Sequence, residues 1–194
     1  MNVEFINPFL ASLMNVLETM ASTKINPGKP AIKKQQVSKG DVSGIIGLAG
    51  PQTKGSLSVT FDEPLALTIM ERMLGEKPDS VNEEVTDMVG EITNMVTGGA
   101  KNTLGDKGYD FDMATPIVVA GKNHTINHQC EGSTLIIPFS SDAGNAYIEV
   151  SFDIDVNSIV HVTAKDLDTQ MKQQIEINSR VGLSSNELQK MIID

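Results

Sequence analysis

The chain has 194 residues and a formal net charge of −10, with 40% apolar residues, 4% aromatic residues and no tryptophan. This length suits one sizeable domain, or a domain with an appendage, around an aliphatic and methionine-rich core. The acidic balance argues against nucleic acid and anionic membranes as partners. The single cysteine, Cys130, excludes an internal disulfide framework and fits a reducing compartment.

The N-terminal segment predicts neither an export signal nor a membrane anchor. It lacks a basic leader and a long uninterrupted apolar core. No apolar run in the sequence approaches the ~18 residues that a membrane helix needs. We therefore expect a soluble, cytoplasmic protein that binds no membrane.

The first part of the chain predicts a helix, then strands, then a second helix. Asn7 followed by Pro8 is typical of a helix start, and apolar residues at helical spacing follow it. Residues 31–61 alternate or run short and apolar between glycines, which indicates strands joined by tight turns. Asp62, with Pro64 close behind, is expected to open the second helix.

A third predicted helix extends to about Leu104. Ser80 and Glu83 match the S-x-x-E pattern of a capping box at its start. At about 100° per residue, its apolar residues gather on one side and should face the core: Val85, Met88, Val89, Ile92, Met95 and Val96.

The rest of the chain predicts further strands, and with them the fold class. Residues 111–121, 133–140 and 146–155 have the apolar and alternating character of strands. We therefore expect an α+β fold in which long helices pack on one side of an antiparallel sheet, followed by a C-terminal β-hairpin and short helix.

The other side of the third predicted helix carries Asp87, Glu91 and Asn94 at positions i, i+4 and i+7. Two acidic residues one turn apart repel each other slightly and do not stabilise a helix. A solubilising face would more naturally include Lys or Arg, and the next basic residue is Lys101. From spacing alone, both a solvated face and a functional one remain open.

The run from Gly55 to Leu104 closely resembles the CheC/CheX/FliY family of chemotaxis phosphatases, above all its CheX branch. In that family an acidic residue or Ser is followed after three residues by Glu, after two more by Asn, and a little over twenty residues later by Pro. The resemblance extends over roughly residues 1–150, and the motif occurs once, as in CheX, whereas CheC typically has two. The matching residues are Asp87, Glu91, Asn94 and Pro116.

The resemblance implies an enzyme that hydrolyses the aspartyl phosphate of the response regulator CheY by inserting a helix into it. Asn94 would hold the attacking water in line with phosphorus, because an amide binds water without repelling the phosphoryl group. Glu91 would dock against a cationic Lys of the receiver domain. Asp87, Pro116 and Gly98 are expected to support the site or contact the partner.

The same resemblance implies no cofactor and no metal ion on this chain, because the Mg²⁺ belongs to the phosphorylated partner. It also implies a homodimer. The alternative is a non-enzymatic module that binds a receiver domain or a peptide without hydrolysis. The presence of both Glu91 and Asn94 favours the enzyme, since a degenerate member would be expected to lose one of them.

Two other motifs suggest ligands on first inspection. His124, His128 and Cys130 form an H-x-x-x-H-x-C string that resembles a zinc motif. We expect a hairpin or strand there, in which residues four apart lie about 13 Å apart and cannot share one ion. Gly50 and Gly55 have the separation of a phosphate loop, but no Lys follows Gly55. We expect neither a metal nor a nucleotide.

From about Ala146 the sequence resembles a second family, in the late part of the peptide-binding domain of the Hsp70 chaperone DnaK. The stretches FDID, HVTAKD and GLSSNELQKM carry this resemblance. We therefore expect two domains, a CheX-like domain at 1–150 and a DnaK-like fragment at 151–194. The fragment should contain a turn at Asn157 and Ser158, two strands, and a short helix with Ser184 and Glu187 as its capping box.

This DnaK-like fragment is not expected to act as a chaperone. The chain contains no ATPase domain, and it lacks the loops that form the peptide cleft in that family. The fragment could prolong the sheet of the first domain, pair with another chain through an exposed strand edge, or stay undocked. The sequence leaves these three outcomes open.

Overall fold

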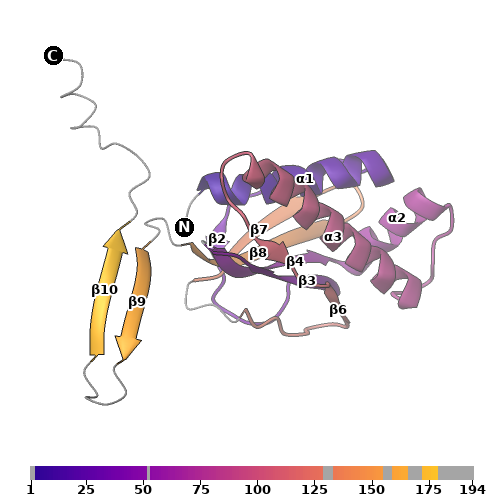
Figure 1. Cartoon of the computed structure of the whole chain (residues 1–194). Coiled ribbons are helices and arrows are strands. Elements are labelled where there is room, and N and C mark those ends of the chain that lie inside the picture. The colour runs from indigo at the N-terminus through magenta and orange to yellow at the C-terminus, as the bar shows by residue number, and fades with distance from the viewer. Residues whose placement is uncertain (1–2, 52, 129–132, 155–158, 166–171, 179–194) are drawn as a thin grey trace. The chain divides into compact units, whose positions relative to one another are not determined.

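The computed structural model describes residues 3–51, 53–128, 133–154, 159–165 and 172–178. The chain divides into two units, Met1–Ile154 and Asp155–Asp194. The helices and strands of the described residues are shown in Figure 1: α1 (Val3–Ala21), β1 (Asn26–Pro27), β2 (Ala31–Ile32), β3 (Val42–Ala49), β4 (Thr53–Phe61), α2 (Glu63–Leu74), α3 (Glu83–Gly105), β5 (Asp112–Met113), β6 (Ile117–Ala120), β7 (Leu135–Ser140), β8 (Asn145–Ile154), β9 (Ile159–Lys165) and β10 (Lys172–Asn178).

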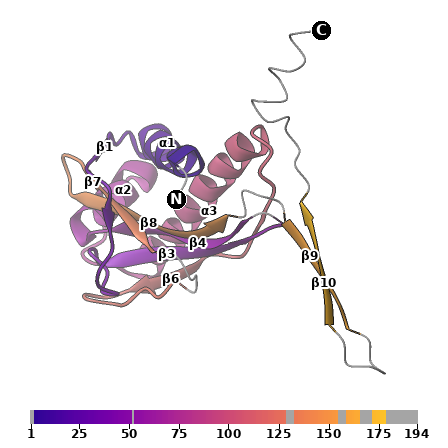
Figure 2. The same ribbon diagram turned by 90° about the vertical axis from the view of Figure 1, so that its left-hand side faces the viewer.

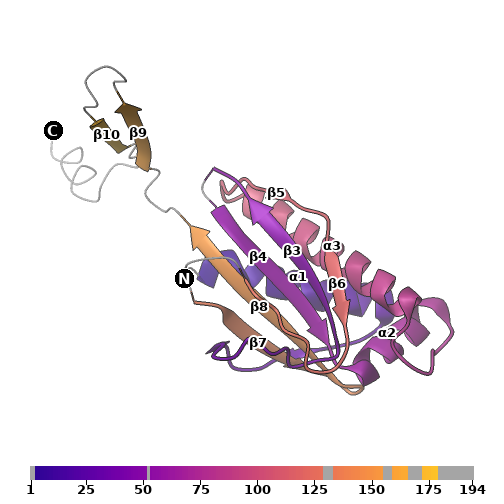
Figure 3. The same ribbon diagram turned by 90° about the horizontal axis from the view of Figure 1, so that it is seen from below.

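The first unit is an antiparallel sheet covered by helices on one face. Its strands lie in the order β1-β7-β8-β4-β3-β5, and β2 pairs with β7 while β6 pairs with β3. Figures 1 and 2 show α1, α2 and α3 on the same side of this sheet, and Figure 3 shows the strands from below. The predicted α+β class, with long helices on one side of an antiparallel sheet, is confirmed.

The core lies between the helices and the sheet. In β4, the alternating residues Leu57, Val59 and Phe61 are fully buried in the core. Successive side chains of a strand point to opposite faces, so Ser58 and Thr60 lie on the face away from the helices. Hydrophobic alternation in the sequence therefore determines which face of the sheet the helices cover.

Helix α3 presents its predicted apolar stripe to this core. Five of the six stripe residues are buried and the sixth is partly buried: Val85, Met88, Val89, Ile92, Val96 and, in part, Met95. The predicted capping box is wrong. The helix begins at Glu83, and its N-cap is Asn82, whose side-chain oxygen accepts a hydrogen bond from the Val85 N–H at 3.0 Å. Asn82 takes this role because it lies directly before the first helical turn.

Two glycines set the position of α3 against its neighbours. A Cβ on Gly44 of β3 would overlap the side chain of Thr93, and a Cβ on Gly99 would overlap Ser12 of α1. The Thr93 hydroxyl donates to the Val89 carbonyl within the helix at 2.7 Å, so it cannot turn away without losing that bond. Only residues without side chains allow these close approaches.

Helix α1 begins earlier than the Asn7–Pro8 pattern predicts. It starts at Val3 and includes Pro8, because Phe5 and Ile6 belong to the core. A proline inside a helix costs about 3 kcal/mol, whereas burying two side chains of this size contributes roughly 3–6 kcal/mol. The Phe5 ring contacts Phe152 of β8 with ring centroids 4.8 Å apart. Tertiary burial therefore outweighs the local signal for a helix start.

The face of the sheet away from the helices carries a buried polar group. Glu149 of β8 is fully buried and accepts a hydrogen bond from the Lys33 ammonium group at 2.6 Å. His128 lies 3.3 Å from the same carboxylate oxygen through Nε2, and its Nδ1 lies 2.7 Å from the hydroxyl of Ser56. These bonds tie segments distant in sequence to the underside of β4 and β8.

In the second unit, the described residues 159–165 and 172–178 form an antiparallel pair. In this pair Ile159 of β9 lies opposite Asn178 of β10, and Lys165 lies opposite Lys172. Both strands predicted for this part of the chain are confirmed. The predicted turn at Asn157–Ser158, and the helix with its cap at 184–187, lie outside the described residues. None of the helices in the described ranges is long and apolar enough to span a membrane.

Candidate functional site

Three polar side chains point outward from consecutive turns of α3. Asp87, Glu91 and Asn94 are all exposed, on the side of the helix away from the core. Within the described part of the chain, none of these three side chains takes part in a hydrogen bond or an ion pair. Their polar atoms are therefore available to a molecule that approaches this side of the helix.

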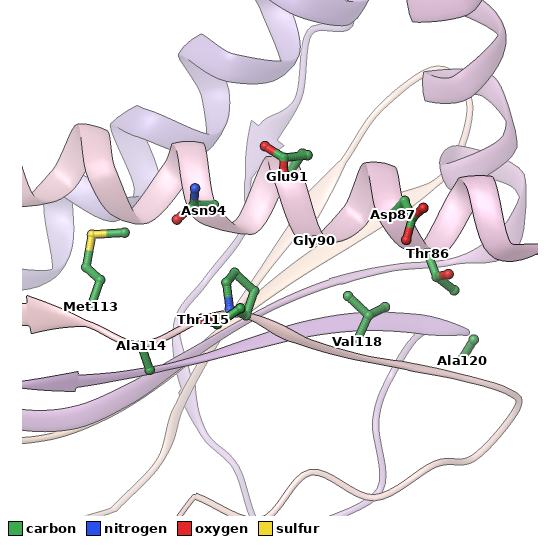
Figure 4. Close-up of a pocket in the computed structure, with 11 residues that line it drawn as sticks. Thr86, Asp87, Gly90, Glu91, Asn94, Met113, Ala114, Thr115, Val118 and Ala120 are labelled. Carbon is green, nitrogen blue, oxygen red and sulfur yellow. The ribbon is translucent and has the colours of Figure 1, made fainter.

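An open hollow of about 840 Å³ separates α3 from the segment that leads into β6. In Figure 4, Thr86 and Asp87 lie at the end near Ala120, and Asn94 lies at the end near Met113 and Thr115. The hollow is lined by Thr86, Asp87, Gly90, Glu91, Asn94, Met113, Ala114, Thr115, Pro116, Val118 and Ala120.

The hollow brings together four of the five residues predicted from the sequence. Asp87, Glu91 and Asn94 form one wall, and Pro116 lies in the opposite wall although more than twenty residues separate it from Asn94. Strand β6 makes this meeting possible, because it pairs with β3 beside α3. Gly98 does not line the hollow, and a Cβ placed there would meet nothing within 4 Å.

The depth of the hollow depends on Gly90. A Cβ at this position would lie 3.4 Å from Cγ2 of Val118, so any larger side chain would extend into the space between α3 and β6. Gly90 is not among the residues predicted from the sequence, although the sequence contains a signal for it. Thr86, Gly90 and Asn94 follow one another at four-residue spacing, which places them in one row along the helix. The β6 side, Met113 to Thr115 and Val118, shows no comparable pattern.

The hollow is acidic and has no positive charge of its own. Asp87 and Glu91 contribute carboxylates and Asn94 contributes an amide, and the residues lining it include no Lys, Arg or His. A free phosphate ion would therefore meet two negative charges without compensation. The arrangement suits a partner that supplies its own cations to the same place, and it leaves the Asn94 amide free to bind water.

The two histidines of the H-x-x-x-H-x-C string bind different parts of the sheet. His124 Nε2 lies 2.7 Å from the Ser43 hydroxyl, whereas His128 bonds to Ser56 and Glu149. The prediction of a hairpin or strand for 123–130 is wrong for its described part, 123–128, which contains no strand and only an isolated bridge between Thr125 and Val37.

The structure describes only part of this string. Cys130 lies outside the described residues. Among those that the structure describes, no three His, Cys, Asp or Glu side chains lie close enough together to hold an ion.

The other glycine-rich stretch is a tight turn between strands. Gly50 follows β3, and its N–H donates to the Thr53 carbonyl at 2.7 Å at the start of β4; Gln52 lies outside the described residues. Asp62 is the N-cap of α2 and accepts the Leu65 N–H at 3.1 Å, as the helix-start pattern predicted.

The fold and the hollow define a CheC-like α+β protein, in which one helix presents acidic and amide side chains beside a short strand. A family model described as "Chemotaxis phosphatase CheX" matches residues 42–140, a range that includes Asp87, Glu91, Asn94 and Pro116. This match spans half of the chain. The chain belongs to the CheX family of chemotaxis phosphatases.

Solved structures agree with this membership. A CheC-like superfamily protein from Shewanella sp. PV-4 is 69% identical, with a TM-score of 0.75, over 79% of this chain and 99% of that one. The chemotaxis protein CheX from Vibrio vulnificus is 68% identical, with a TM-score of 0.74, over 78% and 100%. A protein in the CheX–CheY–BeF3–Mg²⁺ complex from Borrelia burgdorferi is 32% identical, with a TM-score of 0.62, over 78% and 99%.

A second family model, described as "Hsp70 protein", matches residues 134–194. It overlaps the first match at 134–140, within β7 and the residue before it. The Shewanella and Vibrio proteins are matched over 99% and 100% of their own lengths, yet these matches leave about a fifth of this chain uncovered. This chain therefore contains residues that have no counterpart in those two proteins.

Proposed function

We propose that this protein is an aspartyl-phosphate phosphatase that acts on a CheY-type receiver domain. The observation that carries the proposal is the pair Glu91 and Asn94, exposed and without partners among the described residues, one turn apart on the α3 wall of an acidic hollow. Membership of the CheX family supports it, as does the Borrelia burgdorferi relative whose structure is a complex with CheY, BeF3 and Mg²⁺.

In the proposed reaction, Asn94 positions the water that attacks phosphorus. The amide oxygen of Asn94 accepts a hydrogen bond from this water and directs its lone pair along the line of the bond to be broken. The water oxygen forms a bond to phosphorus while the bond from phosphorus to the receiver's carboxylate oxygen breaks. Inorganic phosphate and a free aspartate are the products. A carboxylate in place of the amide would repel the phosphoryl group.

Glu91 would anchor the receiver domain in the correct register. The carboxylate lies one turn before Asn94, on the wall of the same hollow, and is exposed. It is suited to accept a hydrogen bond from a cationic Lys of the receiver. Mg²⁺ on the receiver neutralises the developing charge on the phosphoryl oxygens. No cofactor on this chain takes part, and Asp87 and Pro116 shape the two walls.

Three further parts of the proposal rest on the family resemblance. A homodimer in the cytoplasm is expected, with the receiver domain as partner of each copy. Residues 151–194 are a fused DnaK-like fragment without chaperone activity, consistent with the Hsp70 match at 134–194. Gly98 retains a supporting role one turn beyond Asn94. No observation on the described residues favours a module that binds a receiver without hydrolysis.

The decisive experiment compares the Asn94→Ala and Asn102→Ala variants. The decay of radiolabelled, Mg²⁺-loaded phospho-CheY is followed with each variant and with the unaltered protein. Because a lost positioning group can cost about 100-fold in rate, Asn94→Ala should lose nearly all activity. Asn102 is also an exposed amide on α3, but it does not line the hollow, so Asn102→Ala should retain full activity.

Both variants should unfold at the temperature of the unaltered protein, since both side chains are exposed. Normal turnover by a folded Asn94→Ala protein would refute the assignment of this residue. If the unaltered protein bound the receiver tightly but did not speed the loss of its phosphoryl group, the non-enzymatic binding module would be established instead.

A further inference from the structure

A second hollow lies on the other side of Asp87 and Glu91, between α2 and α3. Its volume is about 540 Å³, and its walls include Met70, Met73 and Leu74 of α2. Asp87 and Glu91 line both this hollow and the acidic one beside β6, so they form the ridge between the two. We call this second space the α2–α3 hollow.

The α2–α3 hollow has an apolar base and an exposed apolar rim. Met70 and Met88 form the base and are only 4% and 7% exposed, whereas Leu74 at the end of α2 is 65% exposed. Burying a leucine side chain contributes about 1.5–3 kcal/mol, so an uncovered Leu74 beside a hollow offers binding energy to a partner. Methionine side chains adapt to the shape of what they contact.

Helix α2 is held in place at both ends, so the hollow is formed before any partner arrives. The Asp62 carboxylate caps the start of α2 and accepts the Asn145 N–H at 2.8 Å. Near the other end, Arg72 donates to the Thr23 hydroxyl and to Asp142, both at 2.8 Å, and this lowers the pKa of the Asp142 carboxyl. A preformed surface loses less entropy on binding.

The edges of the hollow are mainly acidic. Glu76, Glu84, Asp87 and Glu91 line it, with Lys77 as the single basic residue among them. The Lys77 ammonium group is itself paired with Glu71 at 3.5 Å. An apolar group flanked by Lys or Arg would therefore fit this surface better than one flanked by acids.

We propose that the α2–α3 hollow is a second docking contact for the receiver domain. It takes an aliphatic or aromatic side chain, flanked by basic residues, from the receiver surface beside the phosphorylated aspartate. The inference rests on the proposed function, because the partner that engages Glu91 from the acidic hollow also covers the ridge and reaches the space beyond it. The contact selects among receiver domains, since one with an acidic residue at this place is repelled.

The inference is tested by measuring kcat and KM for phosphorylated receiver with Leu74→Ser, Leu74→Met and Ile32→Ser. Leu74→Ser should raise KM about tenfold, the equivalent of one partly buried leucine. It should leave kcat within about twofold, because Leu74 does not line the hollow that contains Asn94. Leu74→Met keeps an apolar side chain and should stay near the unaltered value. Ile32 of β2 is the matched control, since it is 63% exposed and lines neither hollow.

Binding to a receiver domain loaded with beryllofluoride, which mimics the phosphoryl group, should weaken in parallel with the rise in KM. An unchanged KM and affinity for Leu74→Ser, with an active unaltered protein, overturns the docking contact and leaves the phosphatase standing. Loss of self-association in Leu74→Ser, with an unchanged KM, also overturns it and assigns the hollow to a second copy of the chain. An unaltered protein that neither binds nor dephosphorylates the receiver refutes both proposals.

Discussion

Glu91 and Asn94 line the same hollow one turn apart, but only Glu91 carries a charge. In the proposed reaction the carboxylate attracts the receiver, whereas the amide acts on the water molecule. A charge on an exposed side chain acts mainly on encounter and binding, and its effect weakens as salt rises. The two residues should therefore govern different kinetic constants.

The Glu91→Gln variant should separate these roles. We expect KM to rise about tenfold, which corresponds to about 1.4 kcal/mol, with a smaller effect on kcat, and KM should depend less on salt than in the unaltered protein. The measurement is steady-state dephosphorylation at low and high ionic strength. Glu83→Gln is the matched control, because it removes the same charge from the same helix and lines neither hollow. An unchanged salt dependence in Glu91→Gln would show that its charge does not contact the receiver.

Among the residues of the two hollows, the sequence predicted those on α3 better than those that other elements contribute. Asp87, Glu91 and Asn94 follow from helical spacing, although the resemblance was needed to distinguish them from a solvated face. Pro116 came from the resemblance alone. Leu74 could not be predicted, because its exposure depends on how α2 and α3 pack, which the spacing of its neighbours does not record.

At the level of elements, the start of α3 tests which of two residues caps the helix. The sequence offers Ser80 as the cap, whereas the structure uses Asn82. Asn82→Ala should lower the free energy of unfolding by about 1 kcal/mol, because it removes the acceptor for the Val85 N–H. Ser80→Ala should change it by less than about 0.5 kcal/mol. Urea denaturation measures the free energy of unfolding of both variants. A larger loss for Ser80→Ala than for Asn82→Ala would show that Ser80 caps the helix.

The approach of α3 to β3 gives a second test. Gly44→Ala should destabilise the protein by about 1–3 kcal/mol, because the added methyl group meets Thr93 and the helix must shift. Gly47→Ala, in the same strand, is the control, since its Cβ would meet only Ala114 at 3.8 Å. Thermal unfolding of the unaltered protein and of both variants gives the two losses of stability.

A double variant of Gly44 and Thr93 tests whether their contact causes the loss of stability. Removing the Thr93 hydroxyl in a Gly44→Ala/Thr93→Ala protein should recover part of the stability, as expected for residues in direct contact. Simple additivity of the two losses would show that the methyl group does not act through Thr93. The shift should also lower phosphatase activity, because α3 carries Glu91 and Asn94.

The elements that the sequence predicted poorly are those in which tertiary contacts outweigh local pattern. The Asn7–Pro8 pattern predicted the wrong helix start. Helix α1 begins at Val3, because Phe5 packs in the core. Residues 123–130 were predicted to be a hairpin or strand, but the described part, 123–128, contains no strand, and His124 bonds to Ser43 of the sheet. Neither outcome follows from periodicity.

At the level of the whole molecule, the two resemblances predict a boundary between two parts at residue 150. This boundary lies within strand β8, whose alternating pattern suits both families. In the structure β8 extends to Ile154 and pairs with β4 from Ala146 to Ile154, with Phe152 opposite Gly55. The Phe152 ring lies 4.8 Å from the Phe5 ring and 5.7 Å from the Phe9 ring, measured between centroids. Phe152 thus contributes to the core of the first unit.

Truncation distinguishes the boundary predicted at residue 150 from the division after Ile154. A chain ending at residue 154 keeps every β4–β8 pair and should unfold at the same urea midpoint as the first unit in the full chain. A chain ending at residue 150 loses Phe152, and a lost core phenylalanine costs about 3–5 kcal/mol. Far-ultraviolet circular dichroism follows both transitions. Phe152→Ala in the full chain is the control, because it removes the Phe152 ring without shortening the chain. Equal midpoints for the two truncated chains would place the boundary at residue 150.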